Sequence, residues 1–388
     1  MTNGVKLASV RTEREPDGRG RWLAAAALLV WACALVLSCG ARTRLFVLVA
    51  PPDAAASGTA DANDDVAVPD ADAGSDADAV TDAPPQPDDV PNLDFDTGPL
   101  ARSAVLFGGT TFEAGVLDDT WLWTGSSWSL ADDGGLSADA STLGLIGDPT
   151  SGDVMAALGT SLVLVAGSDT WTGIGGDDWT LQRGNVSPPY RVLSVMAPFA
   201  NELVLFGGWG SFGYLGDTWT YDGTSWTASS IVGPSGRQNA AMASLDRKAV
   251  LFGGEYQGVL LGDTWTWDGA AWTELHVASP PPRAEAAMAQ FGSTLILWGG
   301  AGLPGPLADM WAWDGVAWTE IAQTNAPPAR RLATMAAVQA ATPTLVLFGG
   351  NDVTGAPLGD TWVWDGATWT QYLGPAPPPR SGAAMSPL

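Results

Sequence analysis

The sequence of 388 residues predicts an all-β fold assembled from repeated four-stranded units. The first observation is a tryptophan-rich motif, GDTWTWDGAAWT at residues 262–273, which recurs in close copies almost to the C-terminus. The second is an apolar segment ending in Gly-Gly, and the third is a segment headed by Arg-x-x-x-x-Met. Such short segments bounded by turn residues are typical of strands. The other copies of the tryptophan motif begin at Asp119, Asp217, Asp309 and Asp360.

Each copy of the tryptophan motif is expected to form a β-hairpin. Trp265 and Trp267 are two residues apart and therefore share one face of a strand. Asp268 and Gly269 supply the turn, because glycine tolerates positive φ and aspartate can accept hydrogen bonds within its own turn. Trp272 then opens the return strand, opposite Trp267. A buried tryptophan removes about 150–250 Å² from water, so a hairpin with three of them needs a neighbouring sheet as cover.

Two further segments complete the repeat. The Gly-Gly pairs end apolar segments at residues 108–109, 207–208, 253–254, 299–300 and 349–350. The arginine-headed segments begin at Arg191, Arg237, Arg283, Arg330 and Arg380. Paired glycines at a strand end let the backbone approach a neighbouring ring closely. One repeat therefore has four strands, and from the pair at 207–208 onward the Gly-Gly pairs follow at intervals of 46, 46 and 50 residues.

In these features residues 99–388 resemble the kelch repeat, as found in the central domain of galactose oxidases. The matching features are the Gly-Gly pair after an apolar strand, the spaced aromatic residues and the repeat length. A kelch repeat of about 50 residues forms one four-stranded blade of a β-propeller. The resemblance therefore implies a kelch-type β-propeller, and it is specific for fold rather than for activity.

The repeats predict six blades. The first begins at Ser103 with its Gly-Gly strand and lacks an arginine-headed strand, whereas the chain ends with an arginine-headed strand at residues 380–385. We therefore expect the C-terminal strand to complete the first blade beside residues 104–107, which removes exposed sheet edges. Between residues 131 and 190 the repeat is degenerate, but Gly109 and Gly208 are 99 residues apart, so a blade is expected there too.

Residues 1–39 are expected to be a signal peptide or a membrane anchor. A basic region is followed by an uninterrupted apolar run at residues 22–37, whose 16 residues are short for a transmembrane helix. The next segment, LVLSC, resembles a bacterial lipoprotein cleavage box with Cys39 as the lipidated residue. The alternative is an uncleaved anchor, helped by a second apolar patch at residues 45–50. Either alternative predicts an extracytoplasmic protein, anchored at the outer membrane or in the periplasm, or else secreted.

Residues 40–98 are expected to form a disordered acidic linker, because residues 51–96 hold 13 aspartates, no lysine or arginine, and abundant alanine and proline. Calcium binding is disfavoured, since these aspartates lack the spacing of a calcium loop. Residues 99–388 are acidic as well, with ten basic and 26 acidic side chains, which argues against nucleic acid as a partner. The only cysteines are Cys33 and Cys39, so the predicted propeller has no disulfide and no thiolate ligand.

The five repeated arginines make up half of the basic residues of the predicted propeller. Strands alternate direction within a blade, so these arginines and the loops after the Gly-Gly strands are expected on one face. Functionally, a ring of guanidinium groups at the channel mouth would hold carboxylate or phosphate. Structurally, each arginine would pair with the repeated aspartate at Asp217, Asp263, Asp309 or Asp360, or bond backbone carbonyls between blades. The structural role is favoured, because a residue present in nearly every unit usually serves packing between units.

Aromatic residues on the same face are the other binding candidates. Trp209, Phe212 and Tyr214 form an unusually apolar loop, and Tyr256 lies in the loop of the next repeat. Exposed aromatic faces rimmed by carboxylates suit sugar rings or a partner protein. The alternative is that these rings fold down onto the neighbouring blade, and the sequence does not favour either.

Enzyme functions have weaker support. Kelch-type copper oxidases need histidine, tyrosine and cysteine ligands, whereas this propeller has no cysteine and only His276, near a strand end. Metalloprotease, serine hydrolase and nucleotide-binding motifs are absent from the sequence. The runner-up function is a periplasmic sugar mutarotase or epimerase of kelch type. Its acid and base could come from Glu113, Glu255, Glu285 and the repeated arginines.

The sequence thus favours a non-catalytic, extracytoplasmic binding platform on the bacterial cell envelope. Its expected partner is an envelope or extracellular protein or a glycan, and its expected contact with the membrane is through the N-terminus. We expect a monomer that uses no cofactor and no metal.

Overall fold

The computed structural model describes residues 103–111, 115–132, 152–176, 178–184, 186–339 and 342–388. The predicted signal peptide or anchor, Cys39 and the acidic linker lie outside the described residues, as does Glu113. Within the described ranges the chain forms 27 strands and no helix, which confirms the all-β prediction. A helix long and apolar enough to span a bilayer is accordingly not found in these ranges.

Apart from one two-stranded hairpin, the described strands form six antiparallel sheets of four or five strands, which we number as blades in chain order. Blade 1 consists, from the inside outward, of β27 (Ala384–Pro387), β1 (Ala104–Thr111), β2 (Gly115–Trp123) and β3 (Trp128–Asp132). Blade 2 consists of β4 (Val154–Leu158), β5 (Ser161–Ala166), β6 (Asp169–Gly173) and β7 (Thr180–Gln182). Blade 3 consists of β9 (Val195–Phe199), β10 (Glu202–Gly210), β11 (Gly213–Tyr221) and β12 (Trp226–Ala228), with the short β8 (Arg191–Val192) also paired to β10.

The remaining three blades have the same order. Blade 4 consists of β13 (Ala241–Leu245), β14 (Lys248–Phe252), β17 (Thr264–Trp267) and β18 (Trp272–Leu275), and its loop carries the small hairpin of β15 (Glu255–Tyr256) and β16 (Val259–Leu260). Blade 5 consists of β19 (Ala287–Phe291), β20 (Thr294–Trp298), β21 (Met310–Trp313) and β22 (Trp318–Glu320). Blade 6 consists of β23 (Thr334–Gln339), β24 (Pro343–Phe348), β25 (Thr361–Trp364) and β26 (Trp369–Tyr372).

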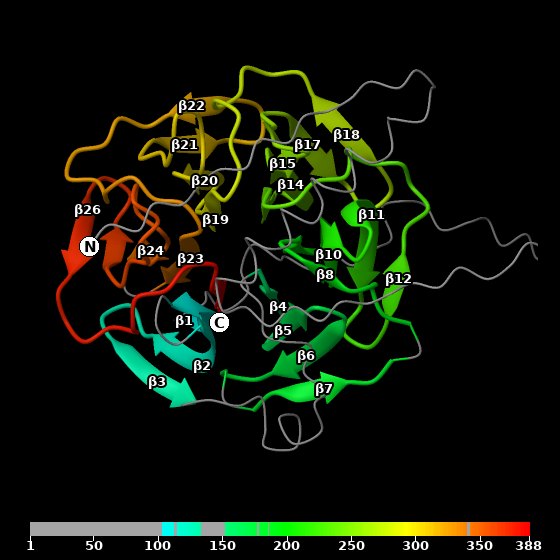
Figure 1. The fold of residues 1–388 in the computed structure, drawn as a ribbon, viewed down its shortest axis with the longest axis horizontal. Coiled ribbons are helices and arrows are strands. Elements are labelled where there is room, and N and C mark those ends of the chain that lie inside the picture. The colour runs from blue at the N-terminus through cyan, green and yellow to red at the C-terminus, as the bar shows by residue number, and fades with distance from the viewer. Residues whose placement is uncertain (1–102, 112–114, 133–151, 177, 185, 340–341) are drawn as a thin grey trace, which may run out of the picture. The chain divides into compact units, whose positions relative to one another are not determined.

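The six blades surround a common centre, as Figure 1 shows. The innermost strands contact one another in a closed circle, in the order β4, β9, β13, β19, β23, β27 and back to β4. The molecule is therefore a six-bladed β-propeller, and the degenerate segment before residue 190 supplies blade 2 as predicted.

The C-terminal strand closes the ring. Strand β27 pairs antiparallel with β1 from Ala104 opposite Pro387 to Phe107 opposite Ala384, which confirms the predicted partner. Backbone hydrogen bonds in both directions between Thr110 and Ser381 extend this pairing. Blade 1 is thus built from both ends of the described chain, and its inner strand lies between those of blades 6 and 2.

The hydrophobic core is divided into six clusters, and each fills the space between two adjacent blades. In the cluster between blades 3 and 4, the ring centroids of Trp267 and Trp272 are 5.5 Å apart, and Phe206 lies 5.3 Å from Trp272. Trp267 and Trp272 face each other across the hairpin, as the motif predicts. The tryptophans of each hairpin therefore pack on the preceding blade, and no blade covers its own apolar face.

Candidate functional site

One end of the propeller carries the loops that join the second and third strands of the blades, together with the segments that connect one blade to the next. We call this end the loop face. The Asp-Gly turns of the tryptophan hairpins lie at the opposite end, because strands alternate direction within each sheet. The five repeated arginines and the aromatic candidates all belong to the loop face.

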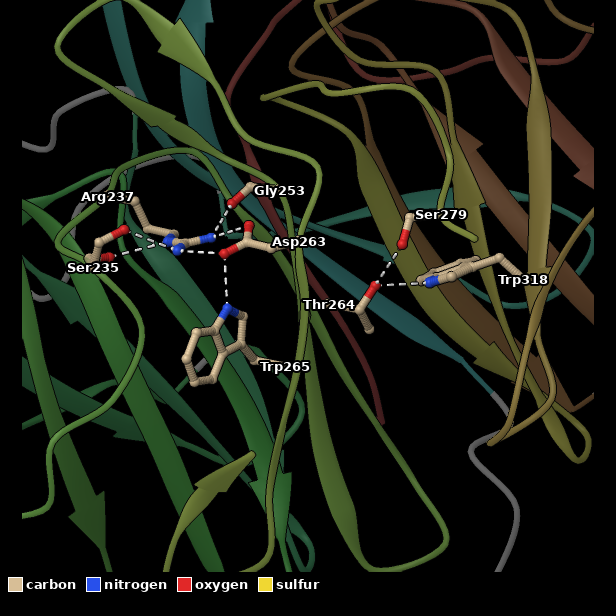
Figure 2. Close-up of polar contacts among 8 residues, drawn as sticks. All are labelled: Ser235, Arg237, Gly253, Asp263, Thr264, Trp265, Ser279 and Trp318. Carbon is tan, nitrogen blue, oxygen red and sulfur yellow. Dashed lines mark hydrogen bonds and ion pairs between the residues drawn. The ribbon is translucent and has the colours of Figure 1, made fainter. Parts of the chain in front are cut away.

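Each repeated arginine forms a bidentate ion pair with the repeated aspartate of its own blade. In blade 4, Arg237 Nη1 lies 2.6 Å from Asp263 Oδ1 and Arg237 Nη2 lies 2.8 Å from Asp263 Oδ2. The same aspartate accepts a hydrogen bond of 2.7 Å from Trp265 Nε1, as Figure 2 shows. The equivalent pairs are Arg191 with Asp217, Arg283 with Asp309, Arg330 with Asp360, and Arg380 with Asp119. The predicted pairing with Asp217, Asp263, Asp309 and Asp360 is therefore present, and the structure adds a fifth pair in blade 1.

The same arginines also hold the paired glycines and the preceding blade. Arg237 Nη1 donates to the carbonyl of Gly253, the first glycine of the pair in its own blade, at 3.0 Å. Its backbone N–H donates to the carbonyl of Leu215, and its own carbonyl accepts from the N–H of Gly208, both in blade 3. Gly208 has a φ of 100°, a conformation that favours glycine, and a Cβ there would lie 2.6 Å from the carbonyl oxygen of Val192. The Gly-Gly motif is therefore required for close backbone packing beside the arginine.

The ion pairs are buried on the arginine side. The five arginines are 0–2% exposed, while the aspartate side chains are 16–36% exposed. Burial by itself raises the pKa of Asp263, but hydrogen bonds and charge from Arg237 and a hydrogen bond from Trp265 outweigh it, so the pKa lies below its usual value. A ligand could reach these guanidinium groups only if the pairs opened and the loops moved. Their role in ligand binding stays a prediction, and their role in joining blades is what the geometry shows.

Three of the aromatic candidates, Trp209, Tyr214 and Tyr256, form a continuous aromatic strip across blades 3 and 4. Trp209 and Tyr214 face each other across β10 and β11, with ring centroids 4.7 Å apart and planes at 85°. Tyr214 in turn contacts Tyr256 of β15 at 5.0 Å. Trp209 and Tyr256 are 41% and 38% exposed, and Phe212 at the loop tip is fully exposed. The rings pack on one another and still present surface to solvent, so neither sequence alternative describes them completely.

Glu255 connects the two loops that carry this aromatic strip. Its carboxylate accepts hydrogen bonds from Tyr214 Oη at 2.8 Å, from Gln238 Nε2 at 2.6 Å and from the backbone N–H of Gly258. Partial burial raises the pKa of Glu255, but these three donors outweigh it and the pKa is lowered. The hydrogen bond from Tyr214 to Glu255 in turn raises the pKa of the Tyr214 hydroxyl. Glu255 is therefore an ionised positioning group for the rings.

Tyr190 is a further aromatic residue of the loop face that sequence reasoning missed. Blade 2 joins β5 to β6 through a short turn, with Val165 paired to Thr170, whereas the equivalent paired residues of blade 4, Phe252 and Thr264, are twelve residues apart. The Tyr190 ring occupies the space above this short turn, since a Cβ on Gly167 would lie 3.1 Å from it. Tyr190 is 42% exposed. The sequence contains a signal for this residue. Tyr190 directly precedes Arg191, whereas the residue before the repeated arginine is glycine, proline or alanine in the other repeats.

Exposed apolar side chains gather on the loop face. Of the 15 exposed large hydrophobic side chains among the described residues, 12 lie in segments that open on this face. Ile174 and Val316 lie in turns of the opposite end, and Leu130 lies on the outer strand β3. The twelve are Val116, Val186, Tyr190, Trp209, Phe212, Ile231, Val232, Tyr256, Val259, Leu303, Val353 and Leu373. Contiguous exposed apolar patches are typical of interaction sites, and the ring contacts of Tyr214 with Trp209 and Tyr256 make one part of this set contiguous.

A cavity of about 200 Å³ lies at the centre of the propeller and is lined by four consecutive residues from each blade. One of the four is always a methionine, namely Met155, Met196, Met242, Met288, Met335 or Met385. At its edge, the N–H groups of Leu193, Asn239, Glu285, Leu332 and Gly382 each donate to the carbonyl of the equivalent residue in the preceding blade, over 2.9–3.0 Å. All five donors have positive φ. The cavity wall is therefore dominated by backbone and small or apolar side chains.

The residues proposed for an enzyme are engaged elsewhere or lie apart. Glu255 supports the aromatic strip, and Glu285 at the cavity edge forms an ion pair of 3.2 Å with Arg331. His276 is exposed near the end of β18. Among the described residues, no cluster of histidine, cysteine, aspartate or glutamate has the arrangement of a metal site. These positions give no specific support to a mutarotase.

Comparisons of the chain with protein-family models and with curated proteins found no match. The kelch resemblance therefore depends on the repeat itself and stays a prediction, whereas the six-bladed propeller is shown by the strand order and the closed ring.

Proposed function

We propose that this protein is a non-catalytic binding platform of the kelch-propeller type that acts outside the cytoplasm through its loop face. The observation that carries the proposal is the one-sided distribution of exposed apolar side chains, which are concentrated on the loop face and sparse at the opposite end. The loops can carry exposed apolar side chains without loss of the fold, because the ion pairs and the packed tryptophans hold the blades together independently of the loops.

The extracytoplasmic location is inferred from the sequence of residues 1–39. An apolar run of signal-peptide length followed by LVLSC supports attachment of lipid to Cys39. The acidic linker would then hold the propeller away from the anchoring membrane, and the absence of cysteine from residues 99–388 suits an oxidising compartment. Labelling cells with a radioactive fatty acid tests this part, since label on the wild-type chain should be lost in Cys39→Ala.

Binding is tested with the full chain on arrays of glycans and of purified envelope proteins. The triple variant Trp209→Ala, Phe212→Ala, Tyr256→Ala is expected to lose binding by at least tenfold, because it removes three exposed rings that lie in neighbouring loops of the loop face. The matched control is Ile174→Ala with Val316→Ala, which removes exposed apolar side chains from the opposite end. Absence of binding on both arrays, or equal loss in the control, would contradict the proposal.

A further inference from the structure

The aromatic strip of Trp209, Tyr214 and Tyr256 has a fixed shape. Trp209 and Tyr214 are direct cross-strand neighbours, and the Tyr214 hydroxyl is bonded to Glu255 at 2.8 Å. Gln238 anchors the other oxygen of the same carboxylate at 2.6 Å. Rings held in this way lose little conformational freedom when a ligand binds, which favours affinity from a small contact area.

The exposed area of the strip suits a small ligand better than a protein. Trp209 and Tyr256 are 41% and 38% exposed. Since an aromatic side chain has about 150–250 Å² of surface, the two rings together present roughly 150 Å², and Phe212 brings the total to about 400 Å² at most. A stable protein interface buries about 800 Å² on each partner. The strip matches one or two sugar rings instead.

The net negative charge of the propeller and the occupied carboxylate of Glu255 favour a neutral ligand. Residues 99–388 carry 26 acidic and ten basic side chains, which disfavours an anionic ligand. The Glu255 carboxylate already accepts three hydrogen bonds, so it is a poor partner for a cation. Polar groups nevertheless border the rings, since Gln257 Nε2 lies 3.1 Å from Tyr256 Oη and both residues are exposed. Aromatic faces bordered by hydroxyl and amide groups suit a pyranose ring, which has an apolar face and hydroxyls at its edge.

We propose that the aromatic strip binds a neutral glycan, with pyranose rings stacked on Trp209 and Tyr256 and with sugar hydroxyls bonded to the Tyr256 hydroxyl and the Gln257 amide. The inference rests on the proposed function, because it names the ligand class of the same face. It further assigns Glu255 and Tyr214 as positioning residues that hold the two stacking rings in place.

The test uses the full chain in a detergent without a sugar head group. An array of neutral and anionic glycans identifies the ligand, and calorimetry then measures its Kd. Neutral glycans are expected to bind and anionic ones to fail. Trp209→Ala should raise the Kd at least tenfold and Tyr256→Ala at least threefold, whereas Trp209→Phe should retain part of the affinity.

The control is Leu303→Ala, which removes a 90% exposed apolar side chain from the equivalent loop of blade 5 and should change the Kd less than twofold. Thermal unfolding shows whether each variant is folded. The inference is overturned if no neutral glycan binds, or if Trp209→Ala and Tyr256→Ala bind like the wild type. If no glycan binds but an envelope protein binds through the loop face, the proposed function holds and only the sugar inference fails.

Discussion

The indole N–H of Trp318 in blade 5 donates a hydrogen bond of 3.0 Å to the hydroxyl of Thr264 in blade 4 (Figure 2). Both groups are buried, so the bond joins two blades inside the core that they share. The same bond recurs from Trp128 to Thr361, from Trp226 to Thr170 and from Trp272 to Thr218, over 2.9 Å in each case. The threonine of the motif Asp-Thr-Trp is therefore the acceptor for the tryptophan that opens the fourth strand of the next blade.

One repeat departs from this rule and shows its physical basis. Blade 5 has Met310 where the others have threonine, and Trp369 of blade 6 is the tryptophan that would use it. The buried Trp369 Nε1 atom has no hydrogen-bond partner within the part of the chain that the structure describes. Met310 is fully buried in the cluster between blades 5 and 6, so apolar packing takes the place of the hydrogen bond there.

Thr264→Val is expected to lower the free energy of unfolding by about 1–3 kcal/mol, because it keeps the shape of the side chain and leaves the Trp318 N–H buried without an acceptor. Chemical denaturation followed by tryptophan fluorescence measures the change. Thr273→Val, an exposed position on β18 of the same blade, should alter stability by less than about 0.5 kcal/mol. Equal effects of the two substitutions would show that the interblade hydrogen bond adds no stability.

Arg237→Lys is expected to destabilise the propeller by about 3–5 kcal/mol, since an ammonium group cannot reproduce the planar bidentate pair with Asp263 and leaves part of a buried charge network unpartnered. The matched control is Arg247→Lys at an exposed turn of blade 4, where the same substitution should be nearly neutral. A stability of Arg237→Lys equal to that of the control would contradict the structural role of the repeated arginines.

The regular part of the fold could be predicted because its signals are local and repeated. Asp268 and Gly269 determine a hairpin turn, and Trp272 follows at the position that pairs with Trp267. The truncated first repeat and the unfinished last repeat then predicted the pairing of β27 with β1. Blade 2 could be predicted only from its length, because it lacks the Gly-Gly pair and its β5–β6 turn is short.

The candidate site was less predictable, because exposure and hydrogen bonding depend on neighbours that are remote in sequence. The repeated arginines were placed on the correct face and paired as the structural alternative proposed. Tyr214 contacts Tyr256 and donates a hydrogen bond to Glu255, which is 41 residues away in the chain. Nothing in the local sequence indicates that these two loops meet. Tyr190 was missed because the turn that it covers is an exception to the repeat.

Acid is expected to unfold the propeller through its repeated aspartates. The pKa of each of Asp119, Asp217, Asp263, Asp309 and Asp360 is lowered from 3.8 in the folded state. A lowered folded-state pKa means that the ion pairs contribute their full stability above about pH 4–5 and lose it as the pH falls through the folded-state values below 3.8.

Asp263→Asn should therefore reduce stability at pH 7 and flatten its dependence on pH between about 5 and 2, as measured by urea denaturation at a series of pH values. Glu274→Gln, at an exposed position of the same blade, provides the control. A pH dependence of Asp263→Asn that matches the wild type would mean that this carboxylate does not link protonation to folding.

Removal of residues 381–388 is expected to abolish cooperative folding of the propeller. The deletion takes away β27, exposes the edge of β1 and opens the core cluster between blades 6 and 1, from which it removes Met385. The truncated chain should aggregate or unfold without a sharp thermal transition in circular dichroism. A synthetic peptide of residues 380–388 added during refolding should restore part of the transition by pairing with β1, whereas a scrambled peptide should not. A truncated chain that unfolds cooperatively at the wild-type temperature would show that ring closure by the C-terminal strand is dispensable.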